Sequence, residues 1–318
     1  MSKILITGGS GFLGKHLAVA LKDKNTVILA SRNQKALLTA AHILEVESVP
    51  LDVCNYASTI EMFLRYSPDV VIHAAATKFV DLAEKFPNEC IDINIVGSQN
   101  VARAAMAANV SYVLGVSTDK AAPPIANIYG LSKAVMEKLF VSLNGTSMTN
   151  FSCVRYGNVA WSTGSVFPIW KRMIDKSGHI VATGPNMSRF FFPVSQAVDL
   201  IVTALNNKSE IAGKILSVPM KGVEVSRILD VWSQATGATW SVGERRVGDR
   251  DLEYLIAQTE TSSTTSVVLE GREFFLLNGK GIPSINSLIE EYSSRNAKQF
   301  TDDEILQLLL NPPTNEML

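Results

Sequence analysis

Residues 3–14, KILITGGSGFLG, form the stretch of sequence from which the fold class can be predicted. Residues 3–7 are mostly apolar, as in a buried strand, and residues 12–21 carry apolar side chains at helical spacing. Glycines between a strand and a helix permit a tight turn and let a diphosphate approach the free amides at the helix N-terminus. The stretch therefore predicts a dinucleotide-binding loop that contains Gly8, Gly11 and Gly14.

A second motif overlaps this loop. Residues 9–15 also fit G-x-x-x-x-G-K, the start of the phosphate loop of nucleoside triphosphatases. That motif continues with Ser or Thr, whose hydroxyl binds magnesium, whereas this chain has His16. The missing hydroxyl counts against a triphosphatase, so the dinucleotide site is the prediction.

Strand-like and helix-like segments alternate through the first half of the chain. This repeat is typical of a doubly wound parallel sheet, the α/β Rossmann class. After about residue 156 the pattern loosens, and Gly and Pro become frequent. We expect a dinucleotide-binding domain over 1–156, completed by part of 194–218, and a smaller substrate lobe with the C-terminal tail over 157–318. The predicted strands are 3–7, 26–30, 48–53, 69–75, 111–116 and 150–155, and the predicted helices are 12–21, 36–45, 56–66, 89–108 and 127–143.

The composition excludes several functional classes. The 318 residues have a formal net charge of −1 and no long Lys or Arg run, so binding to nucleic acid or to an anionic membrane is not expected. No apolar run is long enough to span a bilayer and the N-terminus lacks a signal-peptide pattern, which favours the cytoplasm. The three cysteines and four histidines show no ligand spacing, so we expect buried free thiols and no metal.

The end of the second strand indicates which dinucleotide binds. NAD-selective sites usually carry an acid there, which binds the ribose 2′-hydroxyl, but this chain has Ser31 and Arg32. A hydroxyl and a guanidinium suit a 2′-phosphate, so we predict NADP; the alternative is that Arg32 is a solvated loop charge. Asp52 and Val53 follow the third strand, where an adenine ring would lie, although Asp52 could instead cap the next helix.

The fifth strand ends in STDK, residues 117–120, and YGLSK follows at 129–133. Tyr129 and Lys133 share one helix face, so the ammonium of Lys133 can lower the pKa of the Tyr129 phenol and can hold the nicotinamide ribose. The end of a parallel strand faces the ligand crevice, so Asp119 and Lys120 are a candidate acid and base, or else a turn cap and a solvated charge. An acid and a base beside a hydride acceptor permit loss of a leaving group as well as oxidation.

Taken in order, the motifs resemble those of the bacterial inverting UDP-N-acetylglucosamine 4,6-dehydratases, a family of extended short-chain dehydrogenases. The resemblance covers nearly the whole chain, and STDKA followed by YGxSK, RYGN and R-x-G-[DE] is far more specific than the glycine loop alone. The matching segments are TGGSGFLG (7–14), SR (31–32), DV (52–53), HAAATKFV (73–80), NECIDINIVGSQNV (88–101), STDKA (117–121), YGLSK (129–133), RYGNV (155–159), GSVFP (164–168), MSRFF (187–191), RRVGDRDLEYLI (245–256) and EYSSRNAKQFTDDEILQLL (291–309).

The resemblance implies a reaction on a UDP-sugar. Tyr129 would remove the 4-hydroxyl proton while C4 gives a hydride to NADP, Lys120 would remove the C5 proton, and Asp119 would protonate the departing 6-hydroxyl. Return of the hydride to C6 and reprotonation of C5 on the opposite face would give a UDP-4-keto-6-deoxy-L-hexosamine for surface glycan synthesis. Thr118 would hydrogen-bond the sugar near C4. Retaining relatives lack the tyrosine, so Tyr129 favours inversion, and the family implies a homo-oligomer.

The resemblance also implies which residues bind the ligands. Lys78, Asn158, Arg189, Arg246 and Asp249 are the expected contacts to the UDP-sugar, although the two arginines could be surface cations and Asn158 could stabilise a turn. The expected cofactor-binding residues are Gly8, Ser10, Gly11, Phe12, Leu13, Gly14, Ser31, Arg32, Asp52, Val53, Ala74, Ala75, Lys78, Tyr129, Lys133 and Val159.

The chain departs from the family pattern at a few places. The stretch from Asp119 to Tyr129 is one residue longer and contains Pro123-Pro124, Thr163 replaces a common arginine, and Trp161 replaces a glycine. Four alternative functions remain open: a UDP-sugar 4-epimerase, a 4-reductase or a 5,6-dehydratase of the same fold, and a non-catalytic NADP-binding protein. A simple epimerase has no use for the Asp119 and Lys120 pair, and a non-catalytic protein need not keep both Tyr129 and Lys133.

Overall fold

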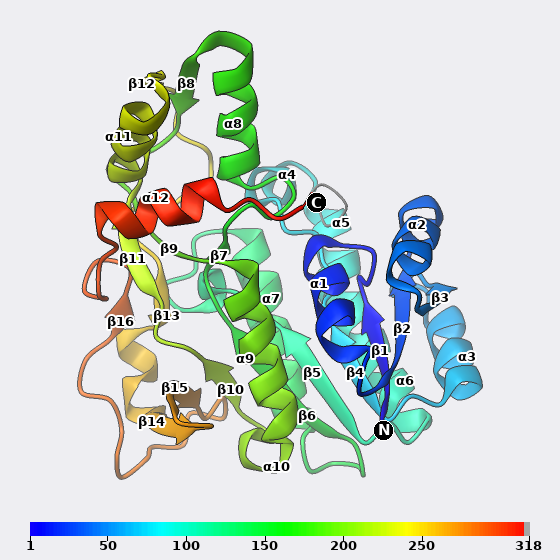
Figure 1. Cartoon of the computed structure of the whole chain (residues 1–318). Coiled ribbons are helices and arrows are strands. Elements are labelled where there is room, and N and C mark those ends of the chain that lie inside the picture. The colour runs from blue at the N-terminus through cyan, green and yellow to red at the C-terminus, as the bar shows by residue number, and fades with distance from the viewer. Residues whose placement is uncertain (315–318) are drawn as a thin grey trace.

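A computed structural model describes residues 1–314 of the chain (Figure 1). Within that range one nine-stranded sheet lies at the centre. Its strands lie in the order β14 (Thr264–Leu269), β15 (Arg272–Leu277), β10 (Ile215–Ser217), β6 (Asn150–Arg155), β5 (Tyr112–Val116), β4 (Val70–His73), β1 (Lys3–Thr7), β2 (Thr26–Ser31) and β3 (Glu47–Pro50). From β3 to β10 the pairing is parallel, whereas β15 is antiparallel to β10 and β14 to β15. The predicted doubly wound α/β class is confirmed.

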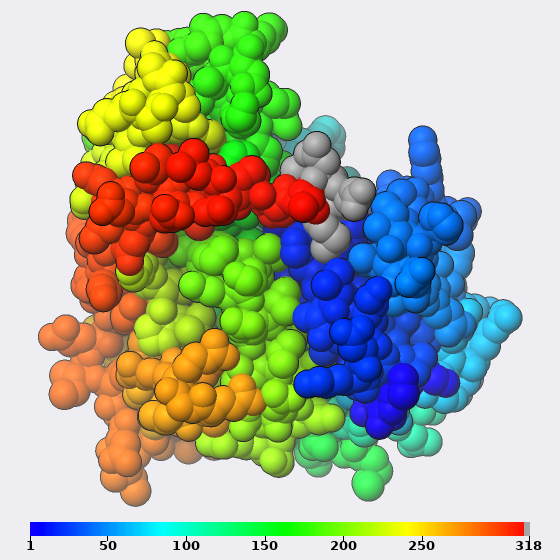
Figure 2. Space-filling model, viewed as in Figure 1, coloured from blue at the N-terminus to red at the C-terminus, as the bar shows by residue number. Residues whose placement is uncertain are grey.

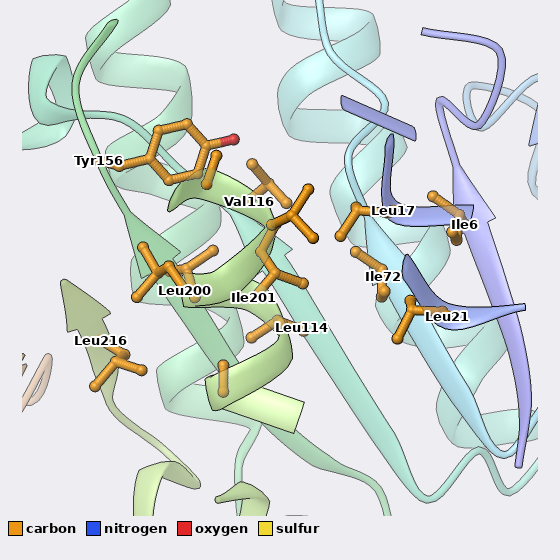
Figure 3. Close-up of a cluster of buried hydrophobic side chains, with 14 of the residues drawn as sticks. Ile6, Leu17, Leu21, Ile72, Leu114, Val116, Tyr156, Leu200, Ile201 and Leu216 are labelled. Carbon is orange, nitrogen blue, oxygen red and sulfur yellow. The ribbon is translucent and has the colours of Figure 1, made fainter. Parts of the chain in front are cut away.

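Helices cover both faces of the sheet, because alternate residues of each buried strand point to opposite sides. On β1, Ile4 and Ile6 pack with Leu17 on one face, whereas Leu5 packs with Phe63 on the other. Figure 3 shows the first of these layers, in which side chains from the sheet meet those of two helices far apart in sequence. The first face carries α1 (Phe12–Leu21), α2 (Gln34–Leu44) and α9 (Val194–Asn206), and the second carries α3 (Tyr56–Tyr66), α6 (Gly97–Ala107) and α7 (Ile128–Leu143).

The single helix predicted over 89–108 is wrong. The chain forms α5 (Pro87–Ile91), a π-helical turn (Asp92–Val96) and then α6. Within the π turn, the Asn94 side chain accepts a hydrogen bond from the Thr77 amide at 2.9 Å and donates to the Thr77 carbonyl at 3.0 Å. It also donates to the Ser132 hydroxyl at 2.9 Å. The irregular turn thus places a buried amide where it ties the segment after β4 to α7.

Part of the chain after residue 156 builds a lobe beyond the carboxyl ends of the parallel strands (Figure 1), and its green, yellow and red surface stands at the top left of Figure 2. Its aromatic core joins α8 (Val166–Ser177), α11 (Val225–Thr236) and α12 (Asp302–Leu310). The domain boundary at 156 stays a prediction, although β10, β14 and β15 of this half join the nine-stranded sheet and α9 covers one of its faces. The remaining elements are β7 (Asn158–Val159), β8 (His179–Ala182), β9 (Ser188–Phe192), β11 (Lys221–Glu224), β12 (Thr239–Val242), β13 (Tyr254–Ile256), β16 (Tyr292–Ser293), α4 (Val80–Lys85), α10 (Lys208–Ile211) and 3-10 turns at Asp119–Ala121 and Gln258–Ser263.

Candidate active site

The glycine loop forms a close-packed turn between β1 and α1. Gly8 has a φ of +71°, and a Cβ there would lie 2.8 Å from the amide nitrogen of Ala75. A Cβ on Gly14 would lie 2.6 Å from the Gly9 carbonyl oxygen, so this contact also needs a glycine. Helix α1 starts after Gly11 without a side-chain cap, which leaves its first amides available to a ligand. The residues present therefore fit a dinucleotide diphosphate.

Ser31 and Arg32 lie at the end of β2, beside the glycine loop. The Ser31 hydroxyl shares a 2.7 Å hydrogen bond with the Ser10 hydroxyl, which links the two loops. Arg32 is exposed, and its guanidinium lies 3.7 Å from the exposed Glu89 carboxylate. An exposed pair of this kind stabilises the chain little, so Arg32 can turn toward an anion at low energetic cost.

The alternative in which Asp52 caps the following helix is wrong. Asn55 is the N-cap of α3 and accepts a hydrogen bond from the Ser58 amide at 3.0 Å. Asp52 instead accepts from the Cys54 amide at 3.0 Å and forms a tight turn directly after β3. Strand β3 ends at Pro50, earlier than the predicted residue 53.

Tyr129 and Lys133 are both buried in α7, beneath the end of β5. The Lys133 ammonium donates a hydrogen bond to the Val116 carbonyl at 2.8 Å, and burial lowers the pKa of this amine to about 8. Burial raises the pKa of the Tyr129 phenol to about 12. Lys120 is the cation that most opposes this rise, with a smaller effect from a hydrogen bond to Thr118, whereas the sequence pointed to Lys133.

Asp119 and Lys120 form a charge pair directly after β5. The Lys120 ammonium donates to Asp119 Oδ1 at 3.1 Å, and the Thr118 hydroxyl donates to the same oxygen at 2.9 Å. Asp119 has no exposed surface, and its Oδ2 has no hydrogen-bond partner among residues 1–314. Burial raises the pKa of the Asp119 carboxyl, although the Lys120 charge opposes the rise. A buried carboxyl with a free oxygen is suited to donate a proton to a ligand.

Backbone packing holds this pair against Tyr129. The Asn127 side chain caps α7 by accepting from the Gly130 amide at 2.7 Å. A Cβ on Gly130 would lie only 2.3 Å from the Lys120 carbonyl oxygen. The turn at Asp119–Ala121 can therefore pack directly against the first turn of α7, at the residue that follows Tyr129.

The expected substrate residues divide into two groups. Asn158 belongs to the acid–base cluster, because its Oδ1 lies 3.5 Å from Lys120 Nζ while its Nδ2 donates to the Phe190 carbonyl at 2.9 Å. Arg189 is largely buried, with its guanidinium 4.0 Å from the Asp249 carboxylate. Arg246 and Lys78 are exposed and stand outside this network.

The remaining expected cofactor residues lie around these groups. Ala74 and Ala75 follow β4 and pack against Gly8, and Val159 is half-buried in β7. Phe12 is buried at the start of α1, whereas Leu13 is half-buried. Val53 packs against Gly97, where a Cβ would lie 2.7 Å from its Cγ2.

Arg250 and Glu253 belong to the same cluster, although the sequence did not single them out. Both are buried, and the Glu253 carboxylate lies 3.4 Å from Lys120 Nζ and 3.9 Å from Arg189 Nε. Both lie within the matching segment RRVGDRDLEYLI (245–256), where they form a pair of opposite charges three residues apart just before β13. From sequence alone, such a pair would be interpreted as a surface salt bridge, because the sequence does not show that the segment is buried by the rest of the chain.

Trp161 occupies a conformation that explains why glycine suits this position. Its φ is +62°, in the left-handed region where side chains are strained. The indole ring is buried edge-on against Phe167 and Trp232, and its N–H donates to the Leu308 carbonyl at 2.8 Å. Trp161 thus fastens α12 to the core of the lobe. Thr163, two residues on, is exposed.

The structure gives no metal centre to the described residues, since no group of three or more His, Cys, Asp or Glu side chains converges in 1–314. All three cysteines are free thiols; Cys90 and Cys153 are buried, but Cys54 is half-buried, contrary to the expectation. Among the helices of this range, none is both long and apolar enough to cross a bilayer.

Comparisons with known proteins agree with this fold. UDP-glucose 4-epimerase of Rickettsia bellii is 32% identical over 97% of this chain and 95% of its own length. The X-ray structure of Pen from Bacillus thuringiensis has a TM-score of 0.88 and 27% identity, covering 98% of this chain and 97% of Pen. A Thermus thermophilus UDP-glucose 4-epimerase solved in complex with NAD has a TM-score of 0.69 at 18% identity, covering 78% of this chain and 88% of that one, and shows the fold alone.

A family model described as "Polysaccharide biosynthesis protein" matches residues 4–269, which is most of the chain and includes both the glycine loop and the acid–base cluster. The chain therefore belongs to the polysaccharide biosynthesis protein family.

Proposed function

We propose that this chain is an NADP-dependent nucleotide-sugar 4,6-dehydratase that acts on UDP-N-acetylglucosamine with inversion at C5. The observation that carries the proposal is the pair formed by the fully buried Asp119 and the largely buried Lys120, whose side chains lie 3.1 Å apart, next to Tyr129. Oxidation of a sugar hydroxyl needs one base, whereas elimination of water needs an additional base and an acid. The cluster holds groups for all three tasks.

NADP is the cofactor that we propose for the glycine loop, with Ser31 and Arg32 receiving its 2′-phosphate. When bound, it would accept a hydride from C4 of the sugar and later return a hydride to C6. Lys133 lies beneath the end of β5, where it would hold the nicotinamide ribose. Asn158, Arg189, Arg246, Asp249 and Lys78 remain the proposed contacts to the UDP-sugar.

The protein's own groups move the protons. Tyr129 takes the proton of the 4-hydroxyl while Lys120 is still protonated and its charge opposes the rise in the pKa of the phenol. The 4-keto group then acidifies the C5 proton, which passes to the neutral amine of Lys120. Asp119 gives its proton to the 6-hydroxyl, which leaves as water. A hydride at C6 and a proton at C5 complete a 4-keto-6-deoxy sugar, so the balance is loss of one water.

For the elimination step the acid and the base must both be uncharged, and the geometry allows this. Lys120 Nζ and Asp119 Oδ1 are within hydrogen-bond distance, so one proton can pass between them. With the proton on the carboxyl, the pair is a neutral acid and a neutral amine, the forms that the two roles require. Burial favours the protonated, neutral form of Asp119, whereas the charges of Asp119 and Glu253 raise the pKa of the Lys120 amine, so Lys120 becomes a base only once its proton has passed to Asp119.

The second candidate function is a UDP-sugar 4-epimerase, because the Rickettsia bellii relative is named UDP-glucose 4-epimerase. An epimerase would use Tyr129 and the cofactor but would leave C5 and C6 untouched. The expected homo-oligomer and cytoplasmic location stay predictions.

Proton NMR of the protein with UDP-N-acetylglucosamine and NADP in heavy water separates these functions. The proposal predicts a new methyl signal, deuterium at C5 and the coupling constants of an L-sugar. Deuterium with retained C5 configuration would overturn inversion. A new UDP-N-acetylgalactosamine spectrum without a methyl signal would establish the epimerase instead.

A further inference from the structure

We propose that Glu253 and Arg250 are positioning residues, which brace the Asp119–Lys120 turn from the C-terminal half of the chain and orient the Lys120 amine. The inference rests on the proposed function, since it assigns these two residues to the elimination step. They act through Asp119 and Lys120 and need no contact with the substrate.

Arg250 holds the main chain of the acid–base loop. Its guanidinium donates to the carbonyl oxygens of Ala122 at 3.1 Å, of Pro124 at 2.7 Å and of Asp119 at 3.2 Å. These three carbonyls lie in the first half of the stretch from Asp119 to Tyr129, which is one residue longer than in the resembling family. Because the donors of a guanidinium form one rigid plane, a single side chain sets the relative positions of all three.

Glu253 connects this brace to the amine of Lys120. One carboxylate oxygen lies 3.4 Å from Lys120 Nζ and 3.9 Å from Arg189 Nε, and the other accepts a 3.0 Å hydrogen bond from Arg250 Nε. Glu253 is only 2% exposed, so water cannot replace these partners. Lys120 Nζ is thus held between two carboxylates, those of Glu253 and Asp119.

The side chain of Glu253 is not needed to hold its own backbone. The Glu253 amide donates to the Ser294 hydroxyl at 3.1 Å, and its carbonyl accepts from the Ser294 amide at 2.8 Å. A buried ion pair is commonly no more stabilising than apolar packing of similar volume. A carboxylate directed at Lys120 is therefore better explained by the requirements of the acid–base pair than by stability.

Charge adds to the geometric argument. Burial would raise the pKa of the Glu253 carboxyl, but Lys120, Arg250 and Arg189 together lower it, so Glu253 stays ionised. Its negative charge raises the pKa values of both Asp119 and Lys120. Within residues 1–314, Arg189 and Tyr129 also act on Lys120, the first lowering its pKa and the second raising it. Glu253 thereby favours a protonated Asp119, the form needed to protonate a leaving hydroxyl, and makes the Lys120 amine a stronger base once its proton has passed to Asp119.

The test compares Glu253→Gln with Glu253→Asp and with a matched control, Glu260→Gln. Glu260 is the carboxylate partner of another buried arginine, Arg155, and makes no contact with the acid–base loop. For Glu253→Gln we expect kcat of dehydration to fall about 100-fold with KM within about threefold, and the pH limb that reports the protonated acid to move toward lower pH. Glu253→Asp should restore the position of that limb, and Glu260→Gln should keep the wild-type profile.

A readout without substrate keeps this inference separate from the proposed function. In NMR titrations of isotope-labelled lysines, the Lys120 signal of Glu253→Gln should titrate at lower pH than in the wild type. A wild-type titration and pH profile in Glu253→Gln, with only a loss of thermal stability, would show a merely structural role and overturn the inference. If the wild type dehydrates no UDP-hexosamine but the titration shifts, the proposed function fails while the positioning role stands. Should Glu253→Gln not fold, Arg250→Lys replaces it, with the same kcat loss expected.

Discussion

Gly130→Ala tests whether the contact between α7 and the Asp119–Lys120 turn sets the catalytic geometry. The added Cβ would lie 2.3 Å from the Lys120 carbonyl oxygen and 3.0 Å from Ile125 Cγ2. An ordinary contact needs about 3.4 Å, so the turn must move by roughly 1 Å away from Tyr129. Replacing a helical glycine by alanine stabilises by about 0.5–1 kcal/mol, whereas overpacking costs about 1–3 kcal/mol. We expect a net loss of about 1 kcal/mol in the free energy of unfolding.

Activity should suffer more than stability, because a displacement of about 1 Å in a catalytic group can lower the rate about 100-fold. The assay is kcat for methyl-group formation. Urea unfolding measures the expected loss of stability, and NADP binding should stay near the wild-type value. Leu131→Ala is the control, since this neighbouring side chain on α7 is 51% exposed. Wild-type kcat in Gly130→Ala would refute the argument that this contact positions the pair.

Three further predictions follow from the site. Lys120→Ala should abolish dehydration but leave NADP binding intact; retained turnover would remove Lys120 from the reaction. Arg32→Ala should weaken NADP binding about tenfold in calorimetry with NAD affinity unchanged, and equal losses for both would contradict a 2′-phosphate contact. Burial lowers the pKa of Lys133 in the folded chain to about 8, whereas its ordinary value is 10.5. Below about pH 8 the buried charge therefore lowers the free energy of unfolding by its full penalty. Between about pH 8 and 10.5 the unfolded chain holds more protons than the folded chain, so this penalty is relieved as the pH rises. Lys133→Met should therefore raise the free energy of unfolding at pH 7 by up to about 3 kcal/mol, and urea unfolding at pH 7 and pH 10 should show the gain shrinking at the higher pH.

Local patterns in the sequence were enough for much of the sheet. The bounds of β1, α1, α3 and β6 match the predicted segments, because each has a clear period of apolar residues and a terminating signal nearby. The predicted helix over 89–108 failed at its π turn, since the interactions of Asn94 that accompany the turn are tertiary. Likewise β14 and β15 join the edge of the sheet by pairing with β10, a long-range contact that no local pattern announces.

The sequence by itself determined the glycine loop, the strand ends that carry STDK, and the spacing of Tyr129 from Lys133, because these depend on residues close together in the chain. Only the tertiary structure decided which charges meet. Glu253 and Arg250 lie more than 120 residues from the loop that they contact, and whether such charges are buried depends on the packing of distant segments. For the same reason, it is the folded chain that makes Lys120 rather than Lys133 the main cation acting on Tyr129.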